Sequence, residues 1–135
     1  MARIYTPKES EKWIPHNLYM SIIYQIRDYD RQKAELDAFR ESADRGHNPT
    51  ERKGIKIVQM GRTVSAIEHA LEDIPKEYRP DVWAHIVNGA PYPDYANIKT
   101  WRKYKLLFIR LVGENLGYLD KDERLGSGGK NNVLL

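Results

Sequence analysis

The chain has no cysteine among its 135 residues, which excludes a disulfide framework and any metal site built on thiolates. It also has no apolar run approaching the ~20 residues of a membrane-spanning helix. Its first residues, MARIYTPKESEKW, are too polar for a secretory signal. These absences predict a soluble intracellular protein that makes no contact with a membrane.

Sequence patterns that accompany catalysis are also missing. Glu68-His69 has no second histidine at the spacing of a zinc protease motif, and no glycine-rich loop is followed by Lys-Ser or Lys-Thr. No serine lies in a recognisable nucleophile context. The four histidines are scattered along the chain: His16, His47, His69 and His85. We expect a protein that is not an enzyme and that holds no cofactor and no metal.

What is present is a globular composition, with 41% hydrophobic and 30% charged residues. The length suits one domain, or one domain with a projecting helical element. No segment alternates polar and apolar residues with period two, whereas several carry apolar residues at three- and four-residue steps. The chain is therefore predicted to be all-α.

The first half predicts a long antiparallel helical hairpin over residues 13–74, preceded by a flexible arm at residues 1–12. After Pro15 no glycine or proline occurs until the polar turn at residues 42–48, so one helix of ~25 residues is expected there. Pro49-Thr50 restarts a helix that ends at Pro75. Apolar steps mark the first helix at Tyr19, Ile22, Ile26, Tyr29 and Leu36, and the second at Ile57, Met60, Val64, Ile67, Leu71 and Ile74. This hairpin could close on itself or against a second copy.

The second half predicts a helix–turn–helix-like unit over residues 75–118. A short helix over residues 76–88 stops at Gly89, and the following APYPDYA contains two prolines and cannot be regular helix. A final helix then begins at a cap, Asp94 or Asn97, and ends near Gly117. The middle element of a three-helix unit is shortened here. Residues 119–135 are poor in apolar residues and predict a disordered tail.

The final helix concentrates the positive charge of the chain. It holds five basic residues and one acid, Glu114, a formal +4, whereas the whole chain is +3. Its apolar stripe carries Trp101, Phe108, Leu111 and Val112, which we expect in the core, and Ile98. A solvated face usually mixes both signs of charge, so this imbalance indicates a surface for a polyanion, and for double-stranded DNA above all.

A helix docked in the major groove reads bases with its first turns. Lys99, Thr100, Arg102 and Lys103 are therefore the candidates for base edges and nearby phosphates, since arginine pairs bidentately with guanine. Lys105 and Arg110 lie further along and are candidates for phosphate contacts.

The chain resembles the RinA/ArpU-like family of phage and prophage late transcriptional regulators. The resemblance covers residues 13–117 and rests on three features, which are a Tyr29-Asp30 patch, a corner at residues 73–79 (DIPKEYR) and a helix headed by residues 100–104 (TWRKY). It implies a C-terminal unit similar to region 4 of sigma factors, and sequence-specific DNA binding in the cytoplasm of a bacterial host. The hairpin would then serve dimerisation or contact with RNA polymerase, and the unbroken apolar seam of its second helix predicts a homodimer.

Two other functions remain open at the level of sequence. A small terminase subunit for DNA packaging also joins helical oligomerisation elements to a DNA-binding unit. Alternatively, a helical adaptor would bind an acidic protein partner through the same basic helix.

Overall fold

The computed structural model describes residues 14–46 and 50–120. The arm expected at residues 1–12 and all but the first two residues of the expected tail lie outside these ranges. The described residues form helices and contain no β-strand, which confirms the all-α class. The helices are α1 (His16–Arg27), α2 (Tyr29–Asp44), α3 (Glu51–Glu72), the single 3-10 turn η2 (Lys76–Tyr78), α4 (Arg79–Asn88) and α5 (Ile98–Asn115).

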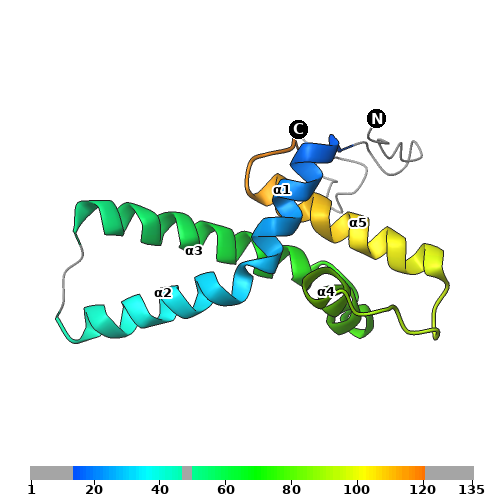
Figure 1. The fold of residues 1–135 in the computed structure, drawn as a ribbon, viewed down its shortest axis with the longest axis horizontal. Helices are drawn as coiled ribbons and strands as arrows, with labels where there is room; N and C mark the ends of the chain where they lie inside the picture. The colour runs from blue at the N-terminus through cyan, green and yellow to red at the C-terminus, as the bar shows by residue number, and fades with distance from the viewer. Residues whose placement is uncertain (1–13, 47–49, 121–135) are drawn as a thin grey trace, which may run out of the picture.

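The first helix expected from the sequence is in fact two helices, because the chain breaks at Asp28. The Asp28 backbone leaves the helical region at φ −90° and ψ 4°. Its carboxylate accepts two hydrogen bonds from the Arg31 guanidinium, at 2.8 and 2.6 Å. The break turns α1 away from the line of α2, as Figure 1 shows. The two helices therefore pack against different parts of the molecule.

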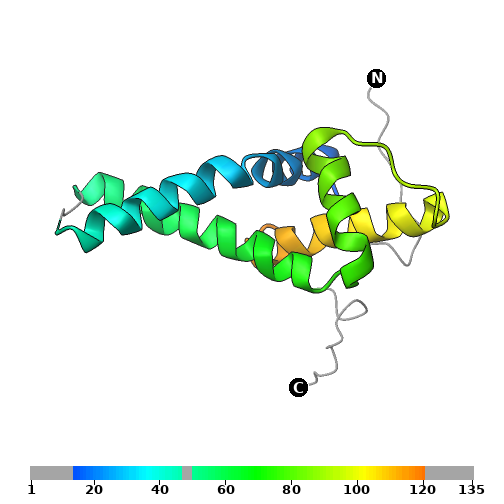
Figure 2. The same ribbon diagram turned by 90° about the horizontal axis from the view of Figure 1, so that it is seen from below.

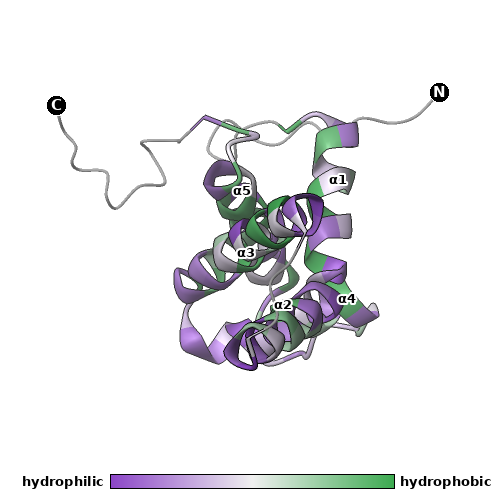
Figure 3. Ribbon diagram, turned by 90° about the vertical axis from the view of Figure 1, so that its left-hand side faces the viewer, coloured by the Kyte–Doolittle hydropathy of each residue, from purple (hydrophilic) through white to green (hydrophobic). Residues whose placement is uncertain are grey.

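Helices α2 and α3 run antiparallel and project from the rest of the molecule (Figures 1 and 2). The Thr50 hydroxyl caps the start of α3 by accepting a hydrogen bond from the Lys53 amide at 3.2 Å. A small apolar cluster of Leu36, Ile57 and Val64 holds the pair together, with Phe39 and Met60 packed against it. Viewed along the pair, hydrophilic residues make up much of its outer surface (Figure 3), although Ile55 and Val58 of α3 are also exposed.

The corner after α3 is fixed by Arg79. Its guanidinium donates to the backbone carbonyls of Ile74 at 2.6 Å and of Glu72 at 2.7 Å. The Glu72 carbonyl belongs to the last turn of α3, where backbone acceptors lack partners within the helix, and Ile74 lies two residues beyond that helix. The DIPKEYR segment thus joins α3 to α4 through one cationic side chain.

The main core lies where α1, the last half of α3, α4 and α5 meet. It includes Ile22, Ile26, Ile67, Ile86 and Phe108, each at most 2% exposed. Helix α1 contacts α4 and α5, and the Arg27 guanidinium donates to the Ile86 carbonyl at 2.9 Å. The sequence predicts these residues in the hairpin unit; in the structure α1 shares the main core with α3 as well as with α4 and α5. No helix within the described ranges is long and apolar enough to cross a membrane.

Candidate nucleic-acid interface

Helix α5 is capped by Asn97, one of the two caps expected from the sequence. The Asn97 side chain accepts a hydrogen bond from the Lys99 amide at 2.7 Å. Three residues that we expected in the core, Trp101, Phe108 and Val112, are 0% exposed. Leu111 is half-buried, and Ile98 is 47% exposed although the apolar stripe included it.

The proline-rich connection before α5 is held by aromatic contacts. The Trp101 indole N–H donates to the Pro93 carbonyl at 3.0 Å, and the Tyr92 ring stacks on Trp101 with a centroid distance of 5.2 Å. The Tyr95 hydroxyl donates to the Asp81 carboxylate of α4 at 2.8 Å. The connection at residues 89–97 is therefore longer than the 3–4-residue turn of a standard helix–turn–helix but is anchored at both ends.

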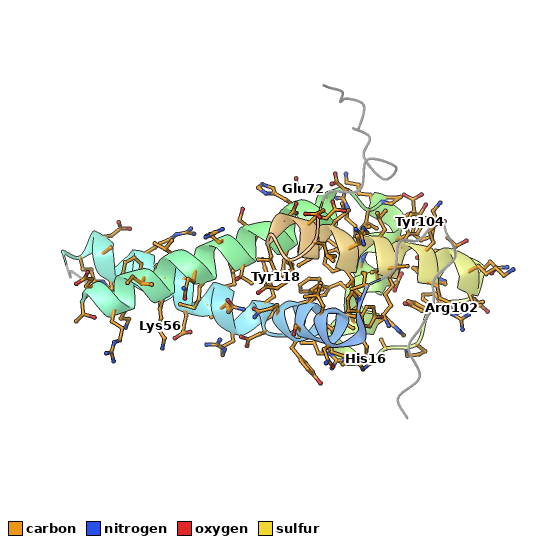
Figure 4. All side chains as sticks on the ribbon, turned by 90° about the horizontal axis from the view of Figure 1, so that it is seen from above. His16, Lys56, Glu72, Arg102, Tyr104 and Tyr118 are labelled. Atoms are coloured by element: carbon orange, nitrogen blue, oxygen red, sulfur yellow. The ribbon has the colours of Figure 1, made fainter. Side chains whose placement is uncertain are left out.

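Only the first turns of α5 reach the surface with basic side chains. Lys99, Arg102 and Lys103 are exposed, whereas no residue from Tyr104 to Glu114 is. The reason is that α5 contacts α1, α3 and α4, which enclose it beyond its first turns. The start of α5 lies at the end of the molecule opposite the tip of the α2–α3 pair, where Figure 4 labels Arg102.

These three cations have no carboxylate partner among the described residues. The ammonium of Lys103 lies 5.4 Å from the centre of the Tyr104 ring. Thr100, the fourth residue predicted to contact bases, is half-buried beside them.

The start of α5 also departs from the usual charge pattern of helices. The N-terminus of a helix carries a partial positive charge, so acidic residues there stabilise the helix and basic ones destabilise it by roughly 0.3–1 kcal/mol each. Helices α2, α3 and α4 follow this rule with Asp30, Glu51 and Asp81 in their first turns. Helices α1 and α5 have no acid in their first turns, and α5 additionally carries Lys99 there. No side chain in the first turn of α5 therefore offsets the partial positive charge of the helix end.

Lys105 belongs to the packing between α4 and α5 rather than to this exposed surface. It is half-buried, and its Nζ lies 3.4 Å from His85 Nε2. The His85 Nδ1 lies 2.9 Å from the Ala90 carbonyl, so Nδ1 carries the proton and Nε2 accepts from the lysine. Burial, and then the nearby Arg27 cation, lower the pKa of Lys105.

The sixth predicted contact, Arg110, is a correction. The residue is 5% exposed, and its Nε lies 3.2 Å from the Glu114 carboxylate, whose side chain is also buried. Its Nη2 lies 3.4 Å from the Asp120 carbonyl. Arg110 is therefore an interior residue and is not available to a phosphate on the surface.

A second group of exposed cations lies on α3 and was not predicted from the sequence. Residues 51–62 of this helix carry four exposed basic residues against one acid, Glu51. Counting basic and acidic residues along this helix, as for the final helix, would have identified the group. The four are Arg52, Lys53, Lys56 and Arg62, of which Figure 4 labels Lys56.

Within residues 14–46 and 50–120, no three His, Asp or Glu side chains gather in a way that could hold a metal ion. Comparison with known proteins gave no match, whether to a family model, to a curated protein or to a solved structure.

Proposed function

We propose that this protein binds double-stranded DNA through the first turns of α5. The observation that carries the proposal is the group of three exposed, unpaired cations, Lys99, Arg102 and Lys103, at the start of a helix. Arginine and lysine side chains are common ligands for phosphate. Their coincidence at one projecting end suits the backbone of a duplex.

Contacts to bases would come from the same turns. Lys99 and Lys103 lie four residues apart on one side of the helix, and Arg102 lies beside them. Arg102 is the candidate for bidentate pairing with guanine, while the two lysines hold phosphates. Helix α4 packs against α5. In this proposal α4 serves as the supporting first helix of such units.

The biological role that we propose is transcriptional regulation in a phage or prophage. Its support is the resemblance of residues 13–117 to RinA/ArpU-like late regulators. The Arg79 corner and the TWRKY head of α5 are the parts of that resemblance that the fold uses directly, the first to join α3 to α4 and the second to present cations.

Two variants with equal loss of charge test the DNA interface. One replaces Lys99, Arg102 and Lys103 by alanine, and the other replaces the exposed Arg52, Lys53 and Lys56 of α3. Fluorescence anisotropy with a labelled random-sequence duplex measures the affinity, and circular dichroism verifies helix content. We expect the α5 variant to lose affinity on the order of tenfold or more, and the α3 variant to stay within about threefold of wild type. An equal loss in both, or a loss in the α3 variant alone, would refute the proposed interface.

A further inference from the structure

One face of α3 carries apolar side chains that no described part of the chain covers. Ile55 is 56% exposed and Val58 is 64% exposed. They lie between Glu51 and Arg62, which are also exposed. The four residues are spaced four, three and four apart, so they form one stripe along the helix. We call this stripe the outer face of α3.

The opposite face of the same helix is fully used within the chain. Ile57 and Val64 pack against Leu36 of α2, and further along Ile67 joins the main core. The seam that led us to expect dimerisation is therefore occupied by the chain's own helices. Any association through α3 must use its outer face instead.

We propose that a second copy of this chain docks on the outer face, with the two α3 helices antiparallel. The spacing of the stripe is the same read in either direction, so a two-fold axis between residues 56 and 57 makes it self-complementary. That axis sets Ile55 against Val58 of the second copy, and Val58 against its Ile55. The apolar contacts then lie at the centre and are made twice, as a two-fold interface requires.

The charges at the ends of the stripe match in the same register. Glu51 meets Arg62 of the second copy, and Arg62 meets its Glu51. Neither residue forms an ion pair with a described residue of its own chain. A parallel arrangement would set Glu51 against Glu51 and Arg62 against Arg62, and repulsion of like charges opposes it. The charge pattern thus supports a second copy of this chain as the partner, and it favours the antiparallel over the parallel arrangement.

Two glycines on α3 fit close approach by another helix. A Cβ added at Gly54 or at Gly61 would meet no atom within 4 Å, so the fold of one chain does not require glycine there. Glycine inside a helix lowers its stability. Because these two positions have no side chain, the backbone of a partner helix has room beside the outer face.

A single pair of helices buries less surface than a standard stable interface, so the dimer dissociates on dilution. The inference is independent of DNA binding, and its test needs no DNA. Sedimentation equilibrium of the full chain should show a mass that rises with concentration from 15.8 kDa toward twice that value. Val58→Asp should weaken association at least tenfold. Lys56→Glu, on the same helix but off the stripe, should leave it unchanged.

A charge swap tests the register with surface substitutions that retain the fold. Glu51→Arg alone, or Arg62→Glu alone, places like charges at both ends of the interface and should weaken self-association. Mixing these two variants pairs opposite charges at both ends and should restore association, between unlike chains. Circular dichroism checks that each variant keeps its helix content.

Three results would overturn the inference. The first is a wild-type chain that stays at 15.8 kDa at the highest concentration measured. The second is undiminished association of the Val58→Asp variant. The third is a mixture of the two charge variants that associates no better than either alone.

Discussion

The Trp101 indole N–H donates a hydrogen bond to the Pro93 carbonyl at 3.0 Å, and this bond joins the first turns of α5 to the connection that precedes them. The same indole is 0% exposed and meets the edge of the Tyr78 ring at 5.2 Å. The side chain that orients the basic turns is therefore also a central core residue. Trp101 therefore contributes both to the position of the first turns of α5 and to the stability of the core beneath them.

Trp101→Ala should destabilise the protein by ~3–5 kcal/mol, since it removes a fully buried aromatic side chain. Trp101→Phe should cost less, because it keeps a packed ring and loses chiefly the bond to the Pro93 carbonyl. Chemical denaturation followed by circular dichroism measures both. Wild-type stability of the alanine variant would show that the indole is exposed.

Arg110 and Arg102 should respond in opposite ways to replacement by alanine. Arg110→Ala removes one partner of a buried ion pair, which costs about 3–5 kcal/mol, and should leave DNA affinity of the folded protein within about twofold. Arg102→Ala should leave stability within about 0.5 kcal/mol of wild type, as for most surface changes, and should weaken DNA binding. Chemical denaturation measures the stability of both variants, and fluorescence anisotropy measures their affinity for DNA. A loss of affinity with full stability in Arg110→Ala would place that arginine on the surface.

Tyr29 predicts a loss of stability at high pH. Its hydroxyl donates to Glu68 at 2.6 Å, and burial, followed by this hydrogen bond, raises its pKa from 10.0 to about 12. As pH rises above 10.0 the unfolded chain releases the phenol proton first, so the stabilisation present below pH 10.0 is lost as pH approaches about 12.

The Tyr29→Phe variant isolates this effect. It should be less stable than wild type at neutral pH, and the difference should shrink between pH 10 and about 12. Tyr92, whose pKa burial also raises to about 12, is present in both proteins and cancels in the comparison. Denaturant midpoints at several pH values measure the difference. A constant difference across this window would contradict the account.

Local signals in the sequence were sufficient for the ends of most helices. Thr50 and Asn97 are capping residues, and Gly89, with φ +70°, ends α4 as expected of a glycine there. These features act within one turn of the chain, so their effect can be predicted without knowing the fold.

The break at Asp28 could not be predicted in the same way. No glycine or proline marks it, and the reason for it is that α1 packs on α4 and α5 while α2 packs on α3. Such contacts link residues far apart in the chain. A periodic apolar pattern running through residue 28 looks the same whether the helix is continuous or broken.

The interior position of Arg110 was missed for a related reason. The amphipathic pattern of α5 predicts one buried side and one exposed side. In the structure, three helices surround α5 beyond its first turns. Lys105 is half-buried and Arg110 is buried as a result, whereas Lys99, Arg102 and Lys103 precede the enclosed part. The net charge of a helix does not reveal which of its charges reach the surface.

The most direct test of the proposed DNA interface is the salt dependence of duplex binding. If Lys99, Arg102 and Lys103 neutralise about three phosphates, log K should fall with log salt concentration at a slope near −2.7 per bound chain. The variant with alanine at all three positions should show a slope near zero. The proposal predicts this difference between the two slopes, and an equally steep slope in both proteins would contradict it.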